Sequence, residues 1–519
     1  MHILGKTWRD GYLDYHRAAG EVRIQVRAWW ALERLSDVFI PQPRSLRRLW
    51  NYFRVYGARE VWLKVKSRLG EALRDRRFFS LGIGEVLEAD PGATLNPGTT
   101  VIFIAQNHPE CVERVCVPNK FAARFDDPNL TRIAPAGDIS LYRGNAPADH
   151  PDWDALAGWS PFSGRDVSTD AARILSWAPA AMARLDPASA QRLPLTTPTP
   201  VVERCESTNT GNASKTAVLF GLGNYAKTLI LPKIDPRIDV RCIHEIEPAQ
   251  IGLQRDGQRA YDTSGDYRPN ERYDVAFIAG YHHTHADLAI HALQQGARVL
   301  VEKPLVTTRP EWLRLQAATQ QHPGHFFAGF HLRYSPLCEL ARTDLKVQPG
   351  EAVHYHCIVF EIPLVRRHWY NWPTSRSRIV CNGCHWLDHF LFLNDWSAPK
   401  RWRLMKAGNG DIIAGVELEN GASFSMTLTD HGSARLGMCD HIELRANGVT
   451  ARIDQGRRYE AEDGQRIVRR ARVHRLAAHH AMYRQVSRKM IAGDPGDSQL
   501  SLERSCELML SLDELLSTG

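Results

Sequence analysis

A turn in the middle of the chain has the residue types and the spacing to bind the pyrophosphate of a dinucleotide. Residues 217–220 are apolar, and Gly221, Gly223 and Ala226 follow them. The first glycine allows a sharp turn, the second lets a pyrophosphate approach the backbone, and the alanine lets the next helix pack closely on the strand. Free amides at the start of that helix would face the phosphate. The pattern therefore predicts one dinucleotide site, and the alternative is an ordinary strand-to-helix turn.

An acidic residue lies where the ribose of such a dinucleotide would be bound. Residues 240–243 are expected to form the second strand, and Glu245 follows them. A carboxylate at this distance from the turn can hold both ribose hydroxyls. It would repel a 2′-phosphate, and Ile246 offers no compensating charge. We therefore expect NAD as the cofactor, with NADP possible if Arg241, on the preceding strand, reaches the ribose.

Lys303 and His385 have the chemistry that hydride transfer to or from an alcohol requires. Lys303 follows the apolar segment 299–301, at the edge of the predicted sheet where ligands bind in such folds. A lysine there can donate a hydrogen bond to a substrate hydroxyl. Hydride transfer from an alcohol also needs a proton acceptor, and histidine titrates in the right range. The alternatives are a surface lysine paired with Glu302 and a buried, satisfied histidine.

The elements that must position these residues form two different patterns. Residues 216–305 alternate between strand-like and helical segments, which predicts a parallel sheet with crossover helices. From about Ser335 the pattern changes to longer strands whose alternation predicts an antiparallel sheet. The last two helices are expected to pack back on the nucleotide domain. The strands are expected at 353–360, 412–418, 423–429 and 441–445, and the helices at 477–491 and 501–516.

The first part of the chain is predicted to be a separate β-rich unit. Residues 21–27 alternate polar and apolar side chains, and short strands broken by Pro-Gly turns follow at 82–92 and 97–104. These features predict a small β-barrel or sandwich. Residues 46–77 have the pattern of a basic amphipathic helix, for which a solvated face is favoured over nucleic-acid or membrane binding. Residues 170–185 are expected to be helical.

Length and composition limit the class of protein. The chain has 519 residues, which predicts two or three domains. A net charge of +7 from 65 basic and 58 acidic residues is mild for this length and does not favour nucleic-acid binding. We expect no membrane span, because no run of 18 apolar residues exists, and no signal peptide. The ten cysteines lack the spacing of a disulfide framework, which favours a cytoplasmic location.

Several motifs together resemble the glucose–fructose oxidoreductase and inositol dehydrogenase family, Gfo/Idh/MocA. They are the glycine turn, His285, Glu302-Lys303-Pro304, residues 328–336 and residues 383–388. Their order and spacing match the family from about Thr216 to the C-terminus. The N-terminal part resembles a truncated GroES-like domain of medium-chain dehydrogenases, as in bacterial bi-domain oxidoreductases that join the two parts.

This resemblance implies a domain layout and a set of roles. Residues 1–200 would be the truncated GroES-like domain, 201–215 a linker, 216–335 the Rossmann domain and 336–519 an α+β domain with an open antiparallel sheet that binds substrate and builds a homodimer or homotetramer. Lys303 and His385 would be catalytic. The cofactor residues would be Gly221, Gly223, Asn224, Tyr225, Glu245, His282, His285, Glu302 and Lys303. The substrate residues would be Arg333, Tyr334, His368, Trp369, Asn382 and Asp388.

Two motifs suggest other chemistry. Residues 381–385 match the CxxCH haem-attachment motif, and the same cysteines with His385 could bind zinc. The histidines at 282, 283 and 285 look like a metal cluster. The flanking family match accounts for His385, His282 and His285, so we predict no metal and no haem.

Departures from the family pattern concentrate where the substrate is expected. The usual acid before the catalytic histidine is replaced by Cys381 and Asn382, and the positions after Gly-Phe are His331 and Leu332. The leading hypothesis is an NAD(P)-dependent oxidoreductase acting on a small molecule, by default a sugar or nucleotide sugar. The alternatives are an imine or carbonyl reductase of a specialised biosynthetic pathway and a non-catalytic dinucleotide-binding scaffold.

Overall fold

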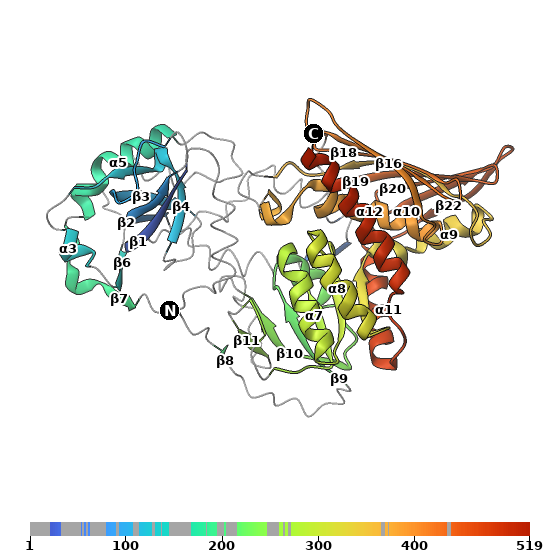
Figure 1. Cartoon of the computed structure of the whole chain (residues 1–519), viewed down its shortest axis with the longest axis horizontal. Coiled ribbons are helices and arrows are strands. Elements are labelled where there is room, and N and C mark those ends of the chain that lie inside the picture. Colours follow the sequence, from blue (N-terminus) through green and yellow to red (C-terminus); the bar gives the residue numbers. More distant parts are fainter. Residues whose placement is uncertain are drawn as a thin grey trace.

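The computed structural model describes the C-terminal three fifths of the chain almost continuously and the N-terminal part in shorter pieces (Figure 1). The described residues are 21–32, 53, 57–58, 61–62, 79–89, 93–106, 114–126, 130–135, 138–144, 168–182, 184–194, 202–203, 215–245, 259–262, 265–267, 271–364, 369–371, 373–432 and 437–518. Among them, no helix is long and apolar enough to cross a membrane. Most of the predicted basic helix at 46–77 lies outside these ranges.

The nucleotide domain contains the predicted parallel sheet. Its strand order is β14-β13-β12-β9-β10-β11-β8, and all neighbours are parallel except β11 and β8. Strands β12 and β14 and residues 217–220 of β9 are apolar and buried, because helices cover both faces of such a sheet. The strands are β8 (Val202–Glu203), β9 (Lys215–Phe220), β10 (Ile238–His244), β11 (Ala260–Asp262), β12 (Val275–Ile278), β13 (Arg298–Glu302) and β14 (Phe326–Gly329).

The order of this sheet reverses beside its first parallel strand. The chain runs from β9 outward to β10, then returns to place β12 on the other side of β9. The carboxyl ends of β9 and β12 therefore flank the crevice in which open α/β sheets bind ligands. The helical segments of this domain are η3 (Ala226–Ile230), η5 (His282–Thr284), α7 (His285–Gln294), α8 (Arg309–Gln321) and η6 (His331–Tyr334).

The C-terminal domain is an eight-stranded sheet with helices on one face. Its order is β16-β17-β18-β15-β19-β20-β21-β22. All neighbours are antiparallel except β15 and β18, which run parallel, so the sheet is mixed at its centre. The strands are β15 (His354–Phe360), β16 (Pro399–Lys406), β17 (Ile412–Leu418), β18 (Ser423–Thr429), β19 (Cys439–Ala446), β20 (Val449–Asp454), β21 (Arg458–Glu462) and β22 (Ile467–Arg472).

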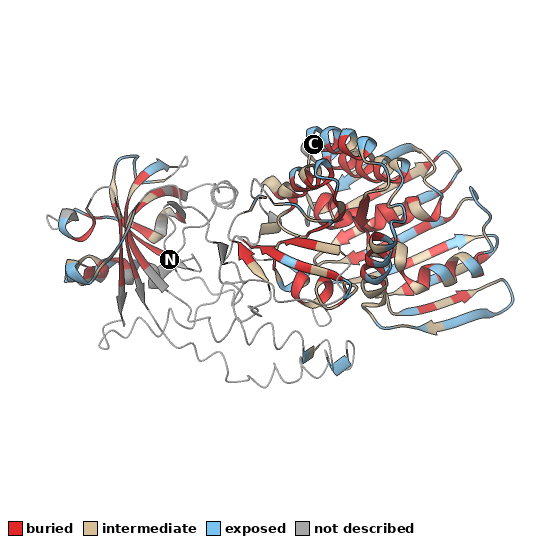
Figure 2. Ribbon diagram, turned by 90° about the horizontal axis from the view of Figure 1, so that it is seen from below, coloured by how far each residue is buried: buried red, intermediate tan, exposed pale blue. Residues whose placement is uncertain are grey.

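Side chains of this sheet alternate between a covered and an open face. Along β15 buried residues alternate with exposed ones, as Figure 2 shows for neighbouring strands. The open face includes Ile358, Trp402 and Met405, which are 45%, 39% and 56% exposed. The helical segments of the domain are α9 (Pro336–Asp344), η7 (Trp369–Asn371), η8 (Pro373–Ser375), η9 (Ile379–Gly383), α10 (Cys384–Leu393), α11 (Ala477–Ala492) and α12 (Gln499–Thr518).

The last two helices pack back on the nucleotide domain, as the sequence predicts. Met482, Tyr483 and Val486 of α11 belong to the same buried cluster as the core of β9 and β10. Leu502 and Leu508 of α12 belong to a second cluster. This cluster is continuous from β12, α7 and α8 of the nucleotide domain through α10 to the covered face of the large sheet. The two domains therefore share one apolar core.

The N-terminal unit is β-rich, as predicted, and is built on one long strand. Strand β1 continues past the predicted 21–27 to Leu32, because the segment after residue 27 is apolar on both faces. Trp29 packs into one buried cluster, and Ala28 and Trp30 pack into another on the opposite face. The elements are β1 (Glu21–Leu32), β2 (Phe79–Ala89), β3 (Thr100–Gln106), β4 (Arg114–Pro118), η1 (Asn119–Phe121), β5 (Ala122–Arg124), α3 (Leu130–Ile133), β6 (Asp138–Gly144), α5 (Ser168–Met182), η2 (Pro187–Ser189) and β7 (Gln191–Pro194).

The observed strand pairing differs slightly from the predicted domain boundaries around residues 191–203. Strand β7 pairs with β6 in the N-terminal sheet, and β8 pairs with β11 in the nucleotide-domain sheet. Residues 202–203 thus lie within the predicted linker but belong to the nucleotide domain. A two-residue edge strand has no periodicity that the sequence could show. A GroES-like identity for the N-terminal sheet stays a prediction.

Candidate active site

The glycine turn lies at the carboxyl end of β9, at the reversal point of the sheet. Gly221 has φ +90°, and a β-carbon there would lie 2.5 Å from the backbone oxygen of Ala279. Its amide donates to the backbone oxygen of His244 at 2.8 Å. By contrast, a β-carbon on Gly223 would meet no atom within 4 Å. Gly221 is thus required by the fold, whereas the space over Gly223 is available to a ligand, as the pyrophosphate prediction needs.

Glu245 lies at the end of β10, beside this turn. Its carboxylate accepts a hydrogen bond from the amide of Leu222 at 2.6 Å, and the residue is buried. The sequence predicts an acid at this position for the ribose hydroxyls, and the structure holds the carboxylate against the turn. Arg241, the residue that could have favoured NADP, bonds the carboxylate of Asp239 at 3.1 Å. Ile246 lies outside the described residues.

Lys303 follows β13 and reaches into the C-terminal domain. Its Nζ donates to the backbone oxygen of Cys381 at 2.9 Å and to the hydroxyl of Tyr370 at 3.2 Å. Burial by itself would lower the pKa of this lysine, but the neighbouring Tyr370 hydroxyl and Cys384 thiol more than offset it, so the pKa is raised. Lys303 is therefore a protonated, hydrogen-bond-donating group at the junction of the two domains.

His385 lies in the first turn of α10, one helical turn after Cys381. The side chain is buried, and its Nδ1 has no hydrogen-bond partner among the described residues. Burial, and then the positive charge of Lys303, hold its pKa well below the ordinary value. The imidazole is therefore neutral at neutral pH, which suits a proton acceptor better than a proton donor.

Two further histidine rings lie next to His385, and the sequence analysis did not predict the three as a unit. The His331 ring lies 4.5 Å from the His385 ring and stacks on the His479 ring at 3.7 Å. Burial lowers the pKa of His331 well below its ordinary value and that of His479 to about 3. Position 331 was noted only as a departure from the family pattern. His479 of α11 follows it by 148 residues, and no local signal connects the two.

Two predicted cofactor residues are joined through the same helix. Tyr483 of α11 donates its hydroxyl hydrogen to Glu302, and its hydroxyl oxygen lies 3.0 Å from that of Tyr225. Burial raises the pKa of Glu302 to about 7, although the Tyr483 hydrogen bond opposes the shift. Tyr483 was not predicted. The contact fixes the side chains that border the glycine turn and Lys303.

The histidines after β12 support the same segment. The two ring nitrogens of His285 lie 2.7 Å from the Pro304 oxygen and 3.2 Å from the Gly280 oxygen. Burial lowers the pKa of His285 to about 4. A neutral imidazole carries one N–H, so this ring donates a hydrogen bond to only one of the two oxygens while it packs between the loop after β12 and the segment after Lys303. His282 instead contacts the ring of Trp369, at 4.6 Å.

Arg333 and Asp388, which the sequence analysis expects to bind substrate, bind each other. Arg333 Nε donates to Asp388 at 2.8 Å, a second ion pair joins Arg333 to Asp497, and Ser505 donates to Asp388 at 2.7 Å. The side chains of Arg333 and Asp388 are 5% and 0% exposed. These contacts hold α10 to η6 and to the C-terminal helices. We therefore leave both residues out of the group that we propose to touch substrate.

The remaining predicted substrate residues lie in different surroundings. Asn382 donates to Glu361 at 2.8 Å, and Glu361 is also paired with Arg378. Trp369 lies in η7 next to Tyr370, and Tyr334 packs at the edge of the cluster around β9. His368 lies outside the described residues.

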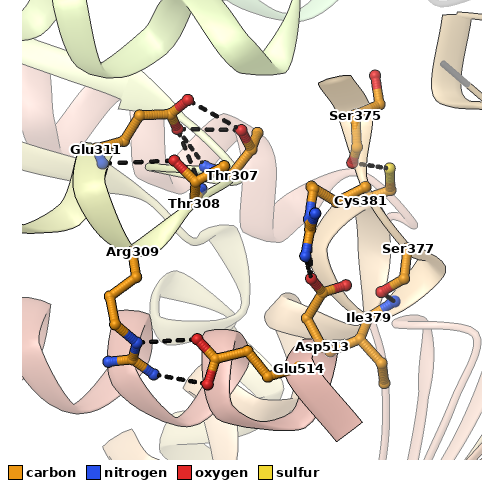
Figure 3. Close-up of polar contacts among 11 residues, drawn as sticks. Thr307, Thr308, Arg309, Glu311, Ser375, Ser377, Ile379, Cys381, Asp513 and Glu514 are labelled. Carbon is orange, nitrogen blue, oxygen red and sulfur yellow. Dashed lines mark hydrogen bonds and ion pairs between the residues drawn. The ribbon is translucent and has the colours of Figure 1, made fainter. Parts of the chain in front are cut away.

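Salt bridges from α12 hold the segment before His385 in place (Figure 3). Arg376 donates to Asp513 at 2.7 and 3.0 Å, and Arg309 of α8 donates to Glu514 at 2.9 Å. The thiol of Cys381 lies 3.1 Å from the backbone oxygen of Ser375. These contacts restrain the segment that contains Cys381, whose backbone oxygen accepts the hydrogen bond from Lys303.

Helix α8 begins with a capping box that fixes the chain soon after Lys303 (Figure 3). The Glu311 amide donates to the hydroxyl of Thr308 at 3.4 Å, and the Thr308 amide donates to the Glu311 carboxylate at 3.2 Å. Such reciprocal bonds satisfy two amides at a helix start.

The cysteines at 381 and 384 do not converge with two further ligand atoms among the described residues. Among the described residues, ligand atoms converge in two groups, namely Cys242 with His244 and Glu271, and Asp411 with Asp430 and His431. Neither group contains Cys381, Cys384 or His385. In the first group, Glu271 already accepts hydrogen bonds from Tyr273 and His244.

Comparison with known proteins identifies the nucleotide domain. Residues 215–330 match the family model of the Gfo/Idh/MocA proteins, described as an oxidoreductase family with an NAD-binding Rossmann fold. Residues 215–330 are thus similar to the NAD-binding Rossmann domain of that oxidoreductase family. The space over Gly223 and the position of Glu245 agree with this cofactor.

The similar curated proteins are dehydrogenases and a catabolic protein. The chain is 28% identical over 116 residues to trans-1,2-dihydrobenzene-1,2-diol dehydrogenase of Xenopus laevis, which is 22% of this chain and 35% of that protein. It is 26% identical over 101 residues to the rhizopine catabolism protein MocA of Rhizobium meliloti, which is 20% of this chain and 32% of that protein. The match thus spans about a third of each relative.

A solved structure extends the likeness to the C-terminal domain at the level of fold. A dehydrogenase from Chromobacterium violaceum superimposes with a TM-score of 0.50 and 15% identity, over 59% of this chain and 96% of that structure. The combination of a Rossmann domain with a large open sheet therefore occurs in that protein too.

Proposed function

We propose that this protein is an NAD-dependent oxidoreductase that moves a hydride between nicotinamide and a ring carbon bearing oxygen or nitrogen. The observation that carries the proposal is the meeting of Lys303 with the turn before His385, through the 2.9 Å bond from Lys303 Nζ to the Cys381 oxygen. It joins a protonated lysine of the NAD-binding domain to a neutral buried histidine. This pair is what oxidation of an alcohol requires.

The roles of this chain's residues follow from that geometry. NAD, when bound, accepts or donates the hydride. The glycine turn would hold its pyrophosphate, and Glu245 its adenosine ribose. Lys303 would donate a hydrogen bond to the reacting oxygen and stabilise negative charge on it. His385, neutral because it is buried beside Lys303, would take the hydroxyl proton onto its imidazole.

The substrate class is inferred from what the similar proteins have in common. One curated relative is named for a cyclic diol, and the family resemblance suggests a sugar or nucleotide sugar. A secondary alcohol on a six-membered ring, or the matching carbonyl, is the chemistry that these share. An imine is the alternative within the same mechanism.

We also propose that the open sheet face with Ile358, Trp402 and Met405 joins two copies of the chain, which light scattering of Met405→Asp would test.

Three variants test the catalytic proposal. Wild type is screened by NADH formation at 340 nm with trans-1,2-dihydrobenzene-1,2-diol, myo-inositol and glucose. His385→Ala and Lys303→Ala should each lower turnover by about 10²–10⁴ while NAD affinity, measured by calorimetry, stays within about twofold. The double variant should lose less than the product of the two, since both act on one oxygen.

The pH dependence gives a further check. Because His385 is already neutral at pH 7, oxidation should be as fast at pH 7.5 as at pH 9. Full turnover by His385→Ala would refute the assignment of the base, and absence of NAD binding by wild type would refute the function itself.

A further inference from the structure

Four aromatic rings from both domains meet beside Lys303. Tyr281 and His282 follow β12 of the nucleotide domain, and Trp369 and Tyr370 form η7 of the C-terminal domain. The ring of Trp369 lies 5.3 Å from Tyr281, 4.6 Å from His282 and 4.3 Å from Tyr370, at interplanar angles of 70–85°. Such edge-to-face contacts are mutually attractive. We refer to these four residues as the aromatic cluster.

The aromatic cluster borders the proposed reacting centre directly. The hydroxyl of Tyr370 is 3.2 Å from Lys303 Nζ, and the same nitrogen lies 5.3 Å from the centre of the Tyr370 ring. Tyr281, Trp369 and Tyr370 are only partly buried, so their rings retain accessible surface. A molecule whose oxygen accepts a bond from Lys303 therefore lies within reach of aromatic surface.

The carboxylates on the surrounding elements are engaged by the protein itself. Saturated polyols are usually recognised by several polar groups, each of which must be available to a hydroxyl. Four carboxylates of the described residues on neighbouring elements already have partners. Glu302 accepts from Tyr483, Glu361 from Arg378 and Asn382, Asp388 from Arg333, and Asp513 from Arg376.

We propose that the substrate is a planar or nearly planar unsaturated six-membered ring that packs on the aromatic cluster, with its reacting oxygen at Lys303. This deepens the proposed function and rests on it. Oxidation breaks the C–H bond of the carbinol carbon and its hydrogen leaves with the electron pair as hydride to NAD⁺. The hydroxyl proton passes to His385, and the carbon becomes a carbonyl. The aromatic surface selects the ring, while Lys303 and His385 serve the single reacting oxygen.

The test uses the full chain saturated with NADH and two probes of equal ring size. Catechol is flat and carries two oxygens, whereas myo-inositol is saturated and carries six. Calorimetry should give a dissociation constant for catechol at least about tenfold below that for myo-inositol. Trp369→Leu should weaken catechol binding by about tenfold and leave NADH affinity within about twofold. Trp62→Leu removes a tryptophan that is 61% exposed outside the cluster, and both affinities should stay unchanged.

Results that would contradict the substrate proposal differ from the result that would contradict the underlying function. Tighter binding of myo-inositol, binding of neither probe, or unchanged catechol affinity in Trp369→Leu would overturn the proposal. A loss of NADH affinity in Trp369→Leu would also overturn it, because the cluster would then serve the nicotinamide. If Trp369→Leu does not fold, Tyr370→Leu repeats the measurement, and Tyr370→Phe, which keeps the ring and loses only the hydroxyl, is its control. Wild type that fails to bind NADH would refute the underlying function instead.

Discussion

A side chain should have different effects at the two glycines of the turn. At Gly223 it should weaken NAD binding, and at Gly221 it should lower stability. In Gly223→Val the β-carbon enters space with no protein atom within 4 Å, so we expect the fold to tolerate the side chain. The side chain would block the approach of the pyrophosphate to the backbone. Hydrogen bonds to a charged group contribute roughly 1.5–3 kcal/mol each. Loss of two amide contacts should therefore weaken NAD binding by about 10²–10⁴, since each 1.4 kcal/mol is about tenfold.

The matched variant, Gly221→Ala, should act on stability instead. Its φ of +90° is strained for any residue with a β-carbon, and that carbon would lie 2.5 Å from the Ala279 oxygen. Backbone strain of this kind costs about 1–3 kcal/mol, and the contact adds to it. Urea unfolding and calorimetric titration of NAD, on both variants, separate the two effects. Normal NAD affinity in Gly223→Val would refute the assignment of the pyrophosphate, and a large loss of stability in that variant would show that the space is not free.

Three further predictions concern cofactor choice, stability and pH. Wild type should bind NAD more tightly than NADP. Glu245→Gln should reduce the ratio of these two affinities, because it removes the negative charge and keeps an acceptor for the Leu222 amide. Tighter binding of NADP by wild type would contradict this. Asp388→Ala would leave a buried arginine without one of its carboxylates and should lower the free energy of unfolding by about 3–5 kcal/mol; unchanged stability with a raised KM would instead support the predicted substrate contact. The free energy of unfolding should also fall as the pH drops from about 6.5 towards 4. Several buried histidines have folded-state pKa values below 6.5 and bind protons only on unfolding, which lowers the free energy of unfolding by up to about 1.4 kcal/mol per pH unit for each group. A urea midpoint that does not change between pH 7 and pH 5 would contradict this. These histidines include His285, at about 4, and His389 and His479, at about 3, together with His331 and His385, whose pKa values burial holds well below 6.5.

Local patterns were sufficient for β15, β17, β18, β19 and the last two helices, whereas β16, β20, β21 and β22 were not predicted. Strands β17 and β18 end at the predicted residues, and α11 differs from its prediction by one residue. Alternation and helical periodicity are properties of neighbouring residues, so the sequence displays them directly. The parallel pairing of β15 and β18 was not predicted, because direction in a sheet depends on connections rather than on the strand's own pattern.

Contacts between distant segments could not be predicted in this way. Lys303 meets Tyr370 across 67 residues, and Tyr483 meets Glu302 across 181. Neither tyrosine has a neighbour pattern that distinguishes it from an ordinary half-buried aromatic residue. The expected roles of Arg333 and Asp388 came from the family resemblance, whereas their pairing depends on packing of α10 against η6.

The apolar core that runs from α7 and α8 through α10 to the large sheet has a consequence for cooperativity. Since neither domain closes its own core, heat or denaturant should melt both in a single transition, and neither should persist as an independent folding unit. The N-terminal sheet has two further buried clusters, and Tyr281 of the nucleotide domain packs against one of them. Because the other members of both clusters come from the N-terminal unit, that sheet is expected to unfold in a separate calorimetric peak. Transfer of this active site to another scaffold would therefore require everything from about residue 202 onward as one piece.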